Sequence, residues 1–356
     1  MSHDSAGAPD LFAALPEGEV GAALLPYLRE ATAVPGLVYA EPPAQITGGF
    51  DTFIYGFAVR GSPEHAGRLI LRVYRDERGP EKARFETLVQ NAIADFGFPT
   101  PRVVFTCIDR GVLGGAFQIM RRLPGVPMGS PMFRPGVQRL PSVLAALQLR
   151  LHGLDREQLR RRLEAADVSV EQLSARATLA RMRAQAAQAQ LDGLQPGLDW
   201  LARNAPEPTQ TVICHGDFHP LNVMLDDGNA SGVLDWTRVA IEDPAFDVGA
   251  TVAIMTQAPL RLPPALSPVI NAVRRWLVGL YLRAYRRERP LDEAALRYYE
   301  AFRCTGFLLE VGEKRRAEAG VIAPIAKPTA FNDTRVIASI CARFRNIAGV
   351  GVALPH

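Results

Sequence analysis

Hydrophobic and polar positions in the first third of the chain predict a helix followed by a sheet. Residues 11–33 carry apolar side chains at helical spacing, and from residue 44 short apolar runs alternate with turn-forming residues. A second stretch with a helical apolar face lies at residues 80–96. Strands on both sides of the turn at 45–51 make a predicted sheet of five, together with those at 68–74, 103–107 and 116–120.

The remainder of the chain reads as mostly helical. A stretch rich in proline and glycine at 124–141 predicts a linker with little regular structure. We therefore expect an N-terminal lobe at 1–123 and a C-terminal lobe at 124–356. Helical apolar spacing in the second lobe occurs at 140–154, in a charged insert at 156–206 that suits a helical hairpin, and at 269–286 and 292–317.

Residues 212–249 combine short apolar runs with most of the chain's candidate chemistry. The runs at 211–214, 222–225 and 232–234 read as buried strands, and the Asp227-Gly228 pair is a hairpin signal. This pattern places Asp217, Asn222 and Asp235 at strand ends. Carboxylate and amide oxygens are hard ligands that suit Mg²⁺, so the pattern predicts a magnesium site.

The sequence HGDFHPLN, followed thirteen residues after its Asn by LDW, resembles the aminoglycoside phosphotransferase and choline kinase family, whose members are related to the protein kinases. The resemblance implies an α+β, bilobal, protein-kinase-like fold, with a small N-lobe built on a five-stranded antiparallel sheet and a larger, mostly helical C-lobe. By position, it makes Asp217 the catalytic base, Asn222 and Asp235 the Mg²⁺ ligands, and His215 a residue that orders the loop.

Two further aspartates follow in the sequence DPAFD. Asp243 and Asp247 lie at the start of a predicted helix, where an aspartate usually caps the helix, and we expect both to be caps. His152 ends the predicted helix at 140–154, and we interpret it as a packing or capping residue in preference to a catalytic base.

The N-lobe residues would bind the nucleotide. In the related kinases the turn after the first strand covers the ATP phosphates, which makes Gly48, Gly49 and Asp51 nucleotide candidates, although the protein-kinase glycine pattern is absent. Arg72 lies in a strand at the position where those kinases have a phosphate-binding Lys. An Arg keeps the charge and binds phosphate in bidentate fashion, so the role survives the change.

A charge inside a buried strand needs a partner. In the related kinases a Glu on the following helix pairs with this position, so the resemblance makes Glu86 the expected partner of Arg72, with Glu81 as the reserve. In the family resemblance, the backbone of residues 120–123, from Met120 to Leu123, would bind the adenine edge. Aromatic residues recur at helical spacing in the C-terminal helices, and we expect them in the core: Trp276, Tyr281, Tyr285, Tyr298, Tyr299 and Phe302.

Composition and charge are ordinary and narrow the choice little. The chain has 356 residues, 48% of them hydrophobic and 22% charged, with a formal net charge of +3 that gives no reason to expect nucleic acid binding. No run of eighteen uncharged apolar residues and no leader pattern occurs, so we expect a cytoplasmic protein with no membrane partner. The four cysteines are scattered, which favours buried, reduced thiols.

These features together predict an enzyme that uses ATP and Mg²⁺ to phosphorylate a hydroxyl group of a small molecule, acting as a monomer or homodimer. An antibiotic, either a macrolide or an aminoglycoside, a sugar and an amino alcohol are all open as acceptors. Residues 251–356 contain sixteen Lys and Arg against eight Asp and Glu, which disfavours a polycation. The alternative, a catalytically silent nucleotide-binding protein of the same fold, would be expected to lack Asp217, Asn222 or Asp235.

Overall fold

A computed structural model describes residues 14–46, 52–130, 137–259, 266–323 and 331–355. Its contacts divide the chain into two compact units. Among the described residues, the first unit holds the chain up to Leu88 together with Arg102–Arg122, and the second holds Val89–Pro101 and the chain from Leu123 onward. No helix within the described ranges is long and apolar enough to cross a membrane.

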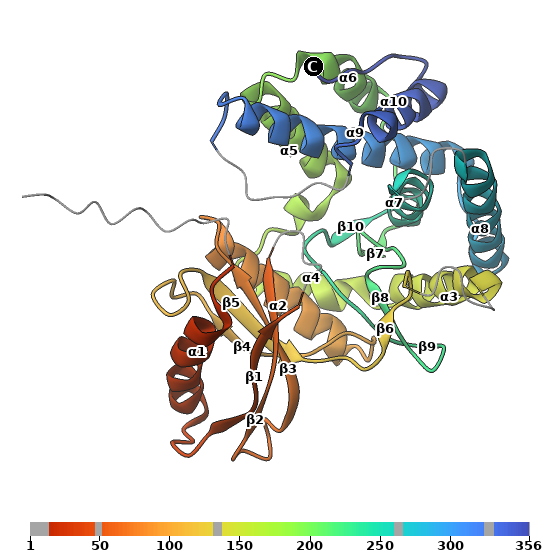
Figure 1. The fold of residues 1–356 in the computed structure, drawn as a ribbon. Coiled ribbons are helices and arrows are strands. Elements are labelled where there is room, and N and C mark those ends of the chain that lie inside the picture. Colours follow the sequence, from red (N-terminus) through yellow and green to blue (C-terminus); the bar gives the residue numbers. More distant parts are fainter. Residues whose placement is uncertain (1–13, 47–51, 131–136, 260–265, 324–330, 356) are drawn as a thin grey trace, which may run out of the picture. The chain divides into compact units, whose positions relative to one another are not determined.

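The first unit is built on the predicted five-stranded antiparallel sheet, whose strand order is β1-β2-β3-β5-β4. Figure 1 shows α1 beside this sheet, and its buried residues Val20, Leu24 and Leu28 join the strand side chains in one core. Its elements are α1 (Glu17–Thr32), β1 (Val38–Gln45), β2 (Phe53–Arg60), β3 (Gly67–Tyr74), β4 (Val103–Cys107) and β5 (Ala116–Arg121), together with the part of α2 (Gly79–Asp95) that precedes Val89.

The second unit is mostly helical, which confirms the predicted fold class. Its helices are α3 (Leu140–His152), α4 (Arg156–Glu164), α5 (Ala175–Gln188), α6 (Gln195–Arg203), α7 (Pro244–Gln257), α8 (Ser267–Glu288), α9 (Glu293–Glu318) and α10 (Thr334–Ala348), with 3-10 turns at Val137–Arg139, Val170–Leu173 and Asp192–Leu194. Its short strands are β6 (Val126–Pro127), β7 (Val212–Cys214), β8 (Val223–Asp226), β9 (Asn229–Val233) and β10 (Ala240–Glu242).

One large core joins most of these helices. α9 runs through it and contributes Phe307 and Leu308, which are fully buried, and α7 packs closely along α9. The insert at 156–206 forms α4, α5 and α6, of which α5 and α6 pack on each other as the hairpin prediction expects. One part of the predicted linker is regular, because β6 pairs with β8.

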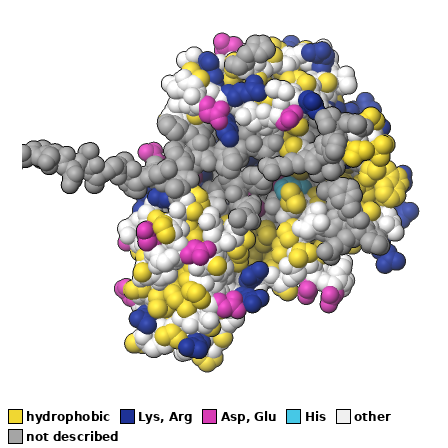
Figure 2. Space-filling model, in the orientation of Figure 1, with side chains coloured by type: hydrophobic (Ala, Val, Ile, Leu, Met, Phe, Trp, Pro, Cys, Tyr) yellow, Lys and Arg dark blue, Asp and Glu magenta, His cyan; other side chains and the backbone are white. Residues whose placement is uncertain are grey.

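Helix α8 exposes an apolar stripe. Leu266, Val269, Val273 and Trp276 recur at helical spacing and are exposed, and Figure 2 shows hydrophobic side chains gathered over this helix. The prediction that Trp276 belongs to the core is therefore wrong, because this side chain is 48% exposed. The other five aromatic residues predicted for the core are buried: Tyr281, Tyr285, Tyr298, Tyr299 and Phe302.

Candidate active site

Two short antiparallel strand pairs frame the loop that carries the predicted catalytic residues. β7 pairs with β10, and β8 pairs with β9 around the two-residue turn Asp227-Gly228. Both turn residues have positive φ, 46° and 81°, as a type I′ turn requires. Residues 215–222 therefore run from the end of one strand to the start of the next, on a frame held by backbone hydrogen bonds.

The backbone of this loop needs the glycine of the His-Gly-Asp sequence. Gly216 has φ +76°, and a Cβ atom there would lie 2.2 Å from the carbonyl oxygen of Arg238. Any other residue would collide with this fixed backbone atom as well as adopt a disfavoured conformation. The close approach brings the loop against the segment that follows Asp235.

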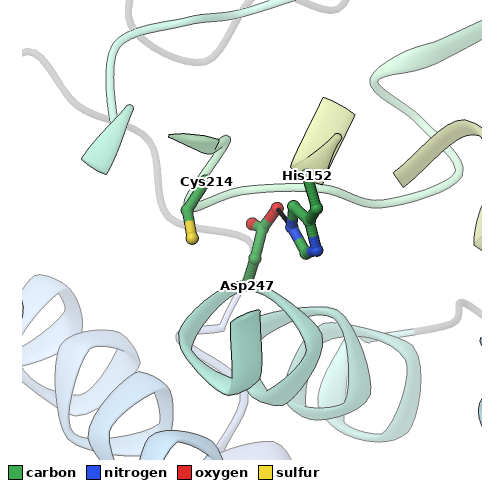
Figure 3. A group of neighbouring side chains, drawn as sticks. All are labelled: His152, Cys214 and Asp247. Carbon is green, nitrogen blue, oxygen red and sulfur yellow. Dashed lines mark hydrogen bonds and ion pairs between the residues drawn. The ribbon is translucent and has the colours of Figure 1, made fainter. Parts of the chain in front are cut away.

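Asp247 holds the backbone of the same loop through hydrogen bonds. Its Oδ1 accepts a hydrogen bond from the Gly216 amide at 2.8 Å, and its Oδ2 accepts one from the His215 amide at 3.1 Å and one from His152 Nε2 at 3.1 Å. Figure 3 shows Asp247 on α7 directed toward His152 on α3. Burial, the largest single influence, acts to raise the pKa of Asp247, but the hydrogen bond and charge of His152, with smaller contributions from His215 and Gln148, together outweigh it and the pKa is lowered.

The expectation that both aspartates cap a helix is thus half wrong. Asp243 is the N-cap of α7, since its Oδ1 accepts a hydrogen bond from the Ala245 amide at 2.8 Å. Asp247 lies one turn inside the helix and is fully buried, where it binds loop amides instead of the amides of its own helix. Position at a helix start could not distinguish the two, because the difference lies in what the tertiary fold places opposite each carboxylate.

His152, Cys214 and Asp247 form a buried group with the residue types of a metal site, and Figure 3 shows them together. Their donor atoms are already used, because both Asp247 oxygens accept hydrogen bonds and His152 Nδ1 lies 2.6 Å from the Tyr285 hydroxyl. Burial raises the pKa of the Cys214 thiol well above its usual value, whereas metals bind the thiolate. Asp247, His152 and Tyr285 therefore form a hydrogen-bonding network that joins α7, α3 and α8, while the Cys214 thiol contacts the Glu242 carbonyl at 3.6 Å.

His215 orders the loop from within. Its Nδ1 accepts a hydrogen bond from the Asp217 amide at 3.3 Å, so its Nε2 carries the proton and donates to the Leu234 carbonyl at 3.0 Å. The ring is buried and packs on Trp236, with 4.7 Å between ring centroids. These contacts link the start of the loop to the residue that precedes Asp235.

Asp217 lies in a strongly charged environment. Its Oδ1 accepts a hydrogen bond from Arg303 Nη2 at 2.7 Å, and its Oδ2 lies 3.5 Å from both Asn222 Nδ2 and His219 Nε2. Burial, the largest single influence, acts to raise the pKa of this carboxyl group, but the Arg303 guanidinium, the contact with His219 and the charge of Arg238 together outweigh it and hold the pKa well below its usual value. Asp217 is therefore ionised at neutral pH. Its side chain is 18% exposed.

Asn222 and Asp235 are brought together by the backbone. The Leu234 amide donates to the Asn222 carbonyl at 2.8 Å, so Asp235 comes directly after a residue bound to Asn222. Asn222 Nδ2 donates to the Asp217 carbonyl at 3.0 Å, which turns the side-chain oxygen Oδ1 away from that contact. Asp235 has φ +68°, a conformation uncommon outside glycine that is often found at functional sites.

This arrangement fits a divalent cation. An amide oxygen and a carboxylate are hard ligands of the kind that Mg²⁺ takes together with phosphate oxygens and water. The amide orientation set by the Asn222–Asp217 hydrogen bond presents oxygen, not nitrogen, as the remaining atom of Asn222. The donor set therefore suits the metal that the sequence predicts.

Of the two glutamates considered as partners of Arg72 in the first unit, Glu86 forms the ion pair and Glu81 does not. Arg72 Nη1 and Glu86 Oε1 lie 2.5 Å apart, with Glu86 fully buried, so the predicted ion pair is present. Glu81 instead lies at the surface beside Arg78. The Tyr74 hydroxyl also donates toward Glu86 Oε2 at 2.5 Å, which holds this carboxylate in place within the unit.

The other residues predicted to bind the nucleotide are Gly48, Gly49, Asp51, Met120 and Leu123. Gly48, Gly49 and Asp51 lie outside the described residues. Met120 is a buried residue of β5, and Leu123 packs over Gly232 in the second unit. A role of Arg72, Glu86 or these residues in nucleotide binding stays a prediction.

Sequence reasoning missed the charged groups that α9 contributes. Arg303 and Glu310 lie beside the Asp217 carboxylate and Arg238, 86 positions after Asp217 in the case of Arg303. The available signal was a charge on an apolar helical face, since Tyr299 and Phe307, four residues to either side of Arg303, are both buried. That signal indicates a buried partner and does not identify it.

Comparison with known sequences finds a matching protein family and several related proteins. Residues 57–291 match the family described as "Phosphotransferase enzyme family". The chain is 30% identical over 209 residues to an aminoglycoside 3'-phosphotransferase of Streptomyces fradiae, which covers 56% of this chain and 75% of that protein. It is 26% identical over 172 residues, or 46% of its length, to mouse acyl-CoA dehydrogenase family member 10, but spans only 16% of that longer protein.

Solved structures share the fold. A putative aminoglycoside phosphotransferase from Ralstonia eutropha superposes with a TM-score of 0.62 at 16% identity, covering 93% of this chain and 99% of that one. The aminoglycoside phosphotransferase APH(4)-Ia, solved as a thermostable variant with ADP and hygromycin B, gives a TM-score of 0.54 at 18% identity, covering 92% and 98%. With the family match extending over residues 57–291, the chain belongs to the phosphotransferase enzyme family.

Proposed function

We propose that this protein is an ATP- and Mg²⁺-dependent phosphotransferase that phosphorylates a hydroxyl group of a small molecule. The observation that carries the proposal is the joint placement of Asp217, Asn222 and Asp235 around one loop anchored by Asp247. The related APH(4)-Ia structure holds ADP, which supports an adenine nucleotide as the donor.

The reaction requires positioning more than covalent chemistry. The acceptor oxygen attacks the γ-phosphorus of ATP, the bond from that phosphorus to the bridging oxygen breaks, and ADP leaves. The acceptor's proton passes to the Asp217 carboxylate. Because Arg303 lowers its pKa, Asp217 is a weak base, which suits a loose transition state in which the proton moves late and the carboxylate mainly orients the hydroxyl.

Asn222 and Asp235 would hold the metal ion. When bound, Mg²⁺ neutralises the charge on the phosphate oxygens of the nucleotide. The positive φ of Asp235 fixes the direction of its carboxylate relative to the strand before it. Arg72, positioned by Glu86 in the first unit, is proposed for the phosphates on its charge and burial.

The acceptor is proposed as a hydroxylated compound without a cluster of ammonium groups near the reacting hydroxyl. Arg303 and Arg238 both lie close to Asp217 and would repel such groups, and this agrees with the positive excess of residues 251–356. A macrolide, a sugar or another uncharged hydroxyl compound meets this requirement better than an aminoglycoside. A silent nucleotide-binding protein gains no support, because all three loop residues are present.

The proposal is tested by ADP release across a panel of hydroxylated metabolites and antibiotics. We expect the variant Asp217→Asn to lose about 10²–10⁴-fold in turnover with its best acceptor, as loss of a general base does. Asp199→Asn, which removes a half-exposed pair with Arg183, is the matched control and should keep wild-type turnover. Equal turnover of wild type and Asp217→Asn would contradict the proposed role.

A further inference from the structure

We propose that Arg303 is a positioning residue that binds one oxygen of the Asp217 carboxylate and thereby leaves the other oxygen for the acceptor hydroxyl. The inference rests on the proposed function and adds to it a residue from α9, which neither the catalytic loop nor the metal ligands include. It makes the orientation of the base depend on a helix distant in sequence.

The contact between Arg303 and Asp217 is short, and neighbouring side chains hold the Arg303 guanidinium in place. Arg303 Nη2 lies 2.7 Å from Asp217 Oδ1, and the Arg303 side chain is 11% exposed. Two neighbours on the same helix hold the guanidinium: the Phe307 ring, 4.5 Å from its central carbon, and Glu310, with Oε1 3.7 Å from Nη1. Arg303 is therefore fixed before any ligand binds.

The second oxygen of Asp217 has only distant partners by comparison. Asn222 Nδ2 and His219 Nε2 each lie 3.5 Å from Oδ2, beyond the usual hydrogen-bond distance. His219 Nδ1 accepts a hydrogen bond from the Leu221 amide, so Nε2 carries the proton and faces this oxygen. Oδ2 can therefore accept a further short hydrogen bond, which is what an acceptor hydroxyl offers.

An external anchor is physically needed here. The terminal torsion of an aspartate is broad, so its carboxylate is not oriented by its own rotamer preference. The loop backbone, held by Asp247, positions the Cα of Asp217 but leaves the carboxylate plane free to rotate. The short contact with Arg303 removes this freedom on one side, and a misplacement of about 1 Å can cost about 100-fold in rate.

Glu310 extends the arrangement toward the metal ligands. Glu310 Oε1 also accepts a hydrogen bond from Arg238, which lies three residues after Asp235. A chain of alternating charges thus runs from Asp217 through Arg303 and Glu310 to Arg238. Through it, one helix contacts both the loop of the base and the segment that follows the proposed metal ligand.

The test compares Arg303→Met with Arg303→Lys and with a matched control. Arg343→Met removes another ion pair to α9, in which Arg343 of α10, 41% exposed, binds both carboxylate oxygens of the buried Glu300 at 2.6 Å, and it does not touch Asp217. We expect kcat to fall about 10- to 100-fold in Arg303→Met while KM for ATP stays within about two-fold, with partial recovery in Arg303→Lys. Arg343→Met should keep kcat even where its melting temperature falls.

Two further measurements separate positioning from folding. In a folded Arg303→Ala variant, added guanidinium ion should restore part of the lost kcat, and it should not affect Arg343→Ala. In the background of Asp217→Asn, the further change Arg303→Met should lower kcat by less than two-fold, because the group that it positions is already gone.

The outcomes distinguish the two proposals. Wild-type kcat in Arg303→Met, beside an inactive Asp217→Asn, would overturn the role of Arg303 and leave the function intact. Independent losses that multiply in the double variant would also overturn it. Equal activity of Asp217→Asn and wild type would instead overturn the proposed function itself.

Discussion

At the scale of single residues, the site depends on buried carboxylates that bind backbone amides. Asp247 accepts three hydrogen bonds, two of them from the amides of His215 and Gly216. Such a group is satisfied only when ionised and surrounded by donors, and a change that removes one acceptor leaves a buried donor without a partner. The loop at residues 215–222 therefore depends on a residue 30 positions after Asp217.

We predict that Asp247→Asn lowers the free energy of unfolding by about 2–3 kcal/mol, because an amide has one acceptor oxygen for three donors. Urea denaturation measures this change. Asp199→Asn removes a surface pair and should cost less than about 1 kcal/mol. A loss in Asp247→Asn no larger than in this control would show that the loop is anchored elsewhere.

The same variant should respond to pH in a defined direction. The pKa of Asp247 is lowered in the folded protein, so its contribution to stability is present above the unfolded pKa of about 3.9 and is lost as pH falls toward the folded pKa. The difference in unfolding free energy between wild type and Asp247→Asn should therefore shrink below pH of about 4. A difference that grows on acidification would contradict the lowered pKa.

At the scale of elements, the β8–β9 hairpin lies in the sequence between the two proposed metal ligands. Its turn folds the strand that follows Asn222 back along the strand that leads to Asp235. Its turn needs positive φ at Asp227 and Gly228, and no atom lies within 4 Å of where a Cβ of Gly228 would be. The glycine is therefore required for its backbone conformation and not for space. This element is local, which is why its two-residue sequence predicts it.

We predict that Gly228→Ala destabilises the protein by about 1–2 kcal/mol through backbone strain alone. Gly18→Ala is a matched control, because Gly18 also has free space around it but lies in α1 without a positive φ. That change should stabilise by about 0.4–1 kcal/mol. Thermal denaturation of both variants gives the comparison, and a neutral Gly228→Ala would show that the turn relaxes.

At the scale of the whole molecule, binding of ligand should stabilise the folded state. A saturating ligand at about 100 times its Kd adds about 2.7 kcal/mol. We predict that ATP with Mg²⁺ raises the melting temperature, that EDTA abolishes the metal-dependent part, and that Asp235→Ala no longer responds to Mg²⁺. An unchanged Mg²⁺ response in Asp235→Ala would remove this residue from the metal site.

Local patterns in the sequence were sufficient to predict most helices and strands and the loop that carries the candidate site residues. Alternating apolar runs predicted the strands of the five-stranded sheet, and helical spacing predicted α2, α8 and α9. The residues Asp217, Asn222 and Asp235 lie within nineteen positions and are joined by short strands and a tight turn, so their proximity follows from sequence. The need of a buried charge for a partner predicted that Arg72 is paired, and the family resemblance identified Glu86 as the partner.

Only the tertiary structure decided which distant groups meet these residues. Arg303 reaches Asp217 from α9, Asp247 binds loop amides instead of capping its helix, and Trp276 lies at the surface although its spacing matched the core. Periodicity states which face of a helix is apolar but not what packs against that face. The sequence by itself thus determined the candidate site through local geometry, whereas the long-range contacts that orient its carboxylates depend on how the helices pack.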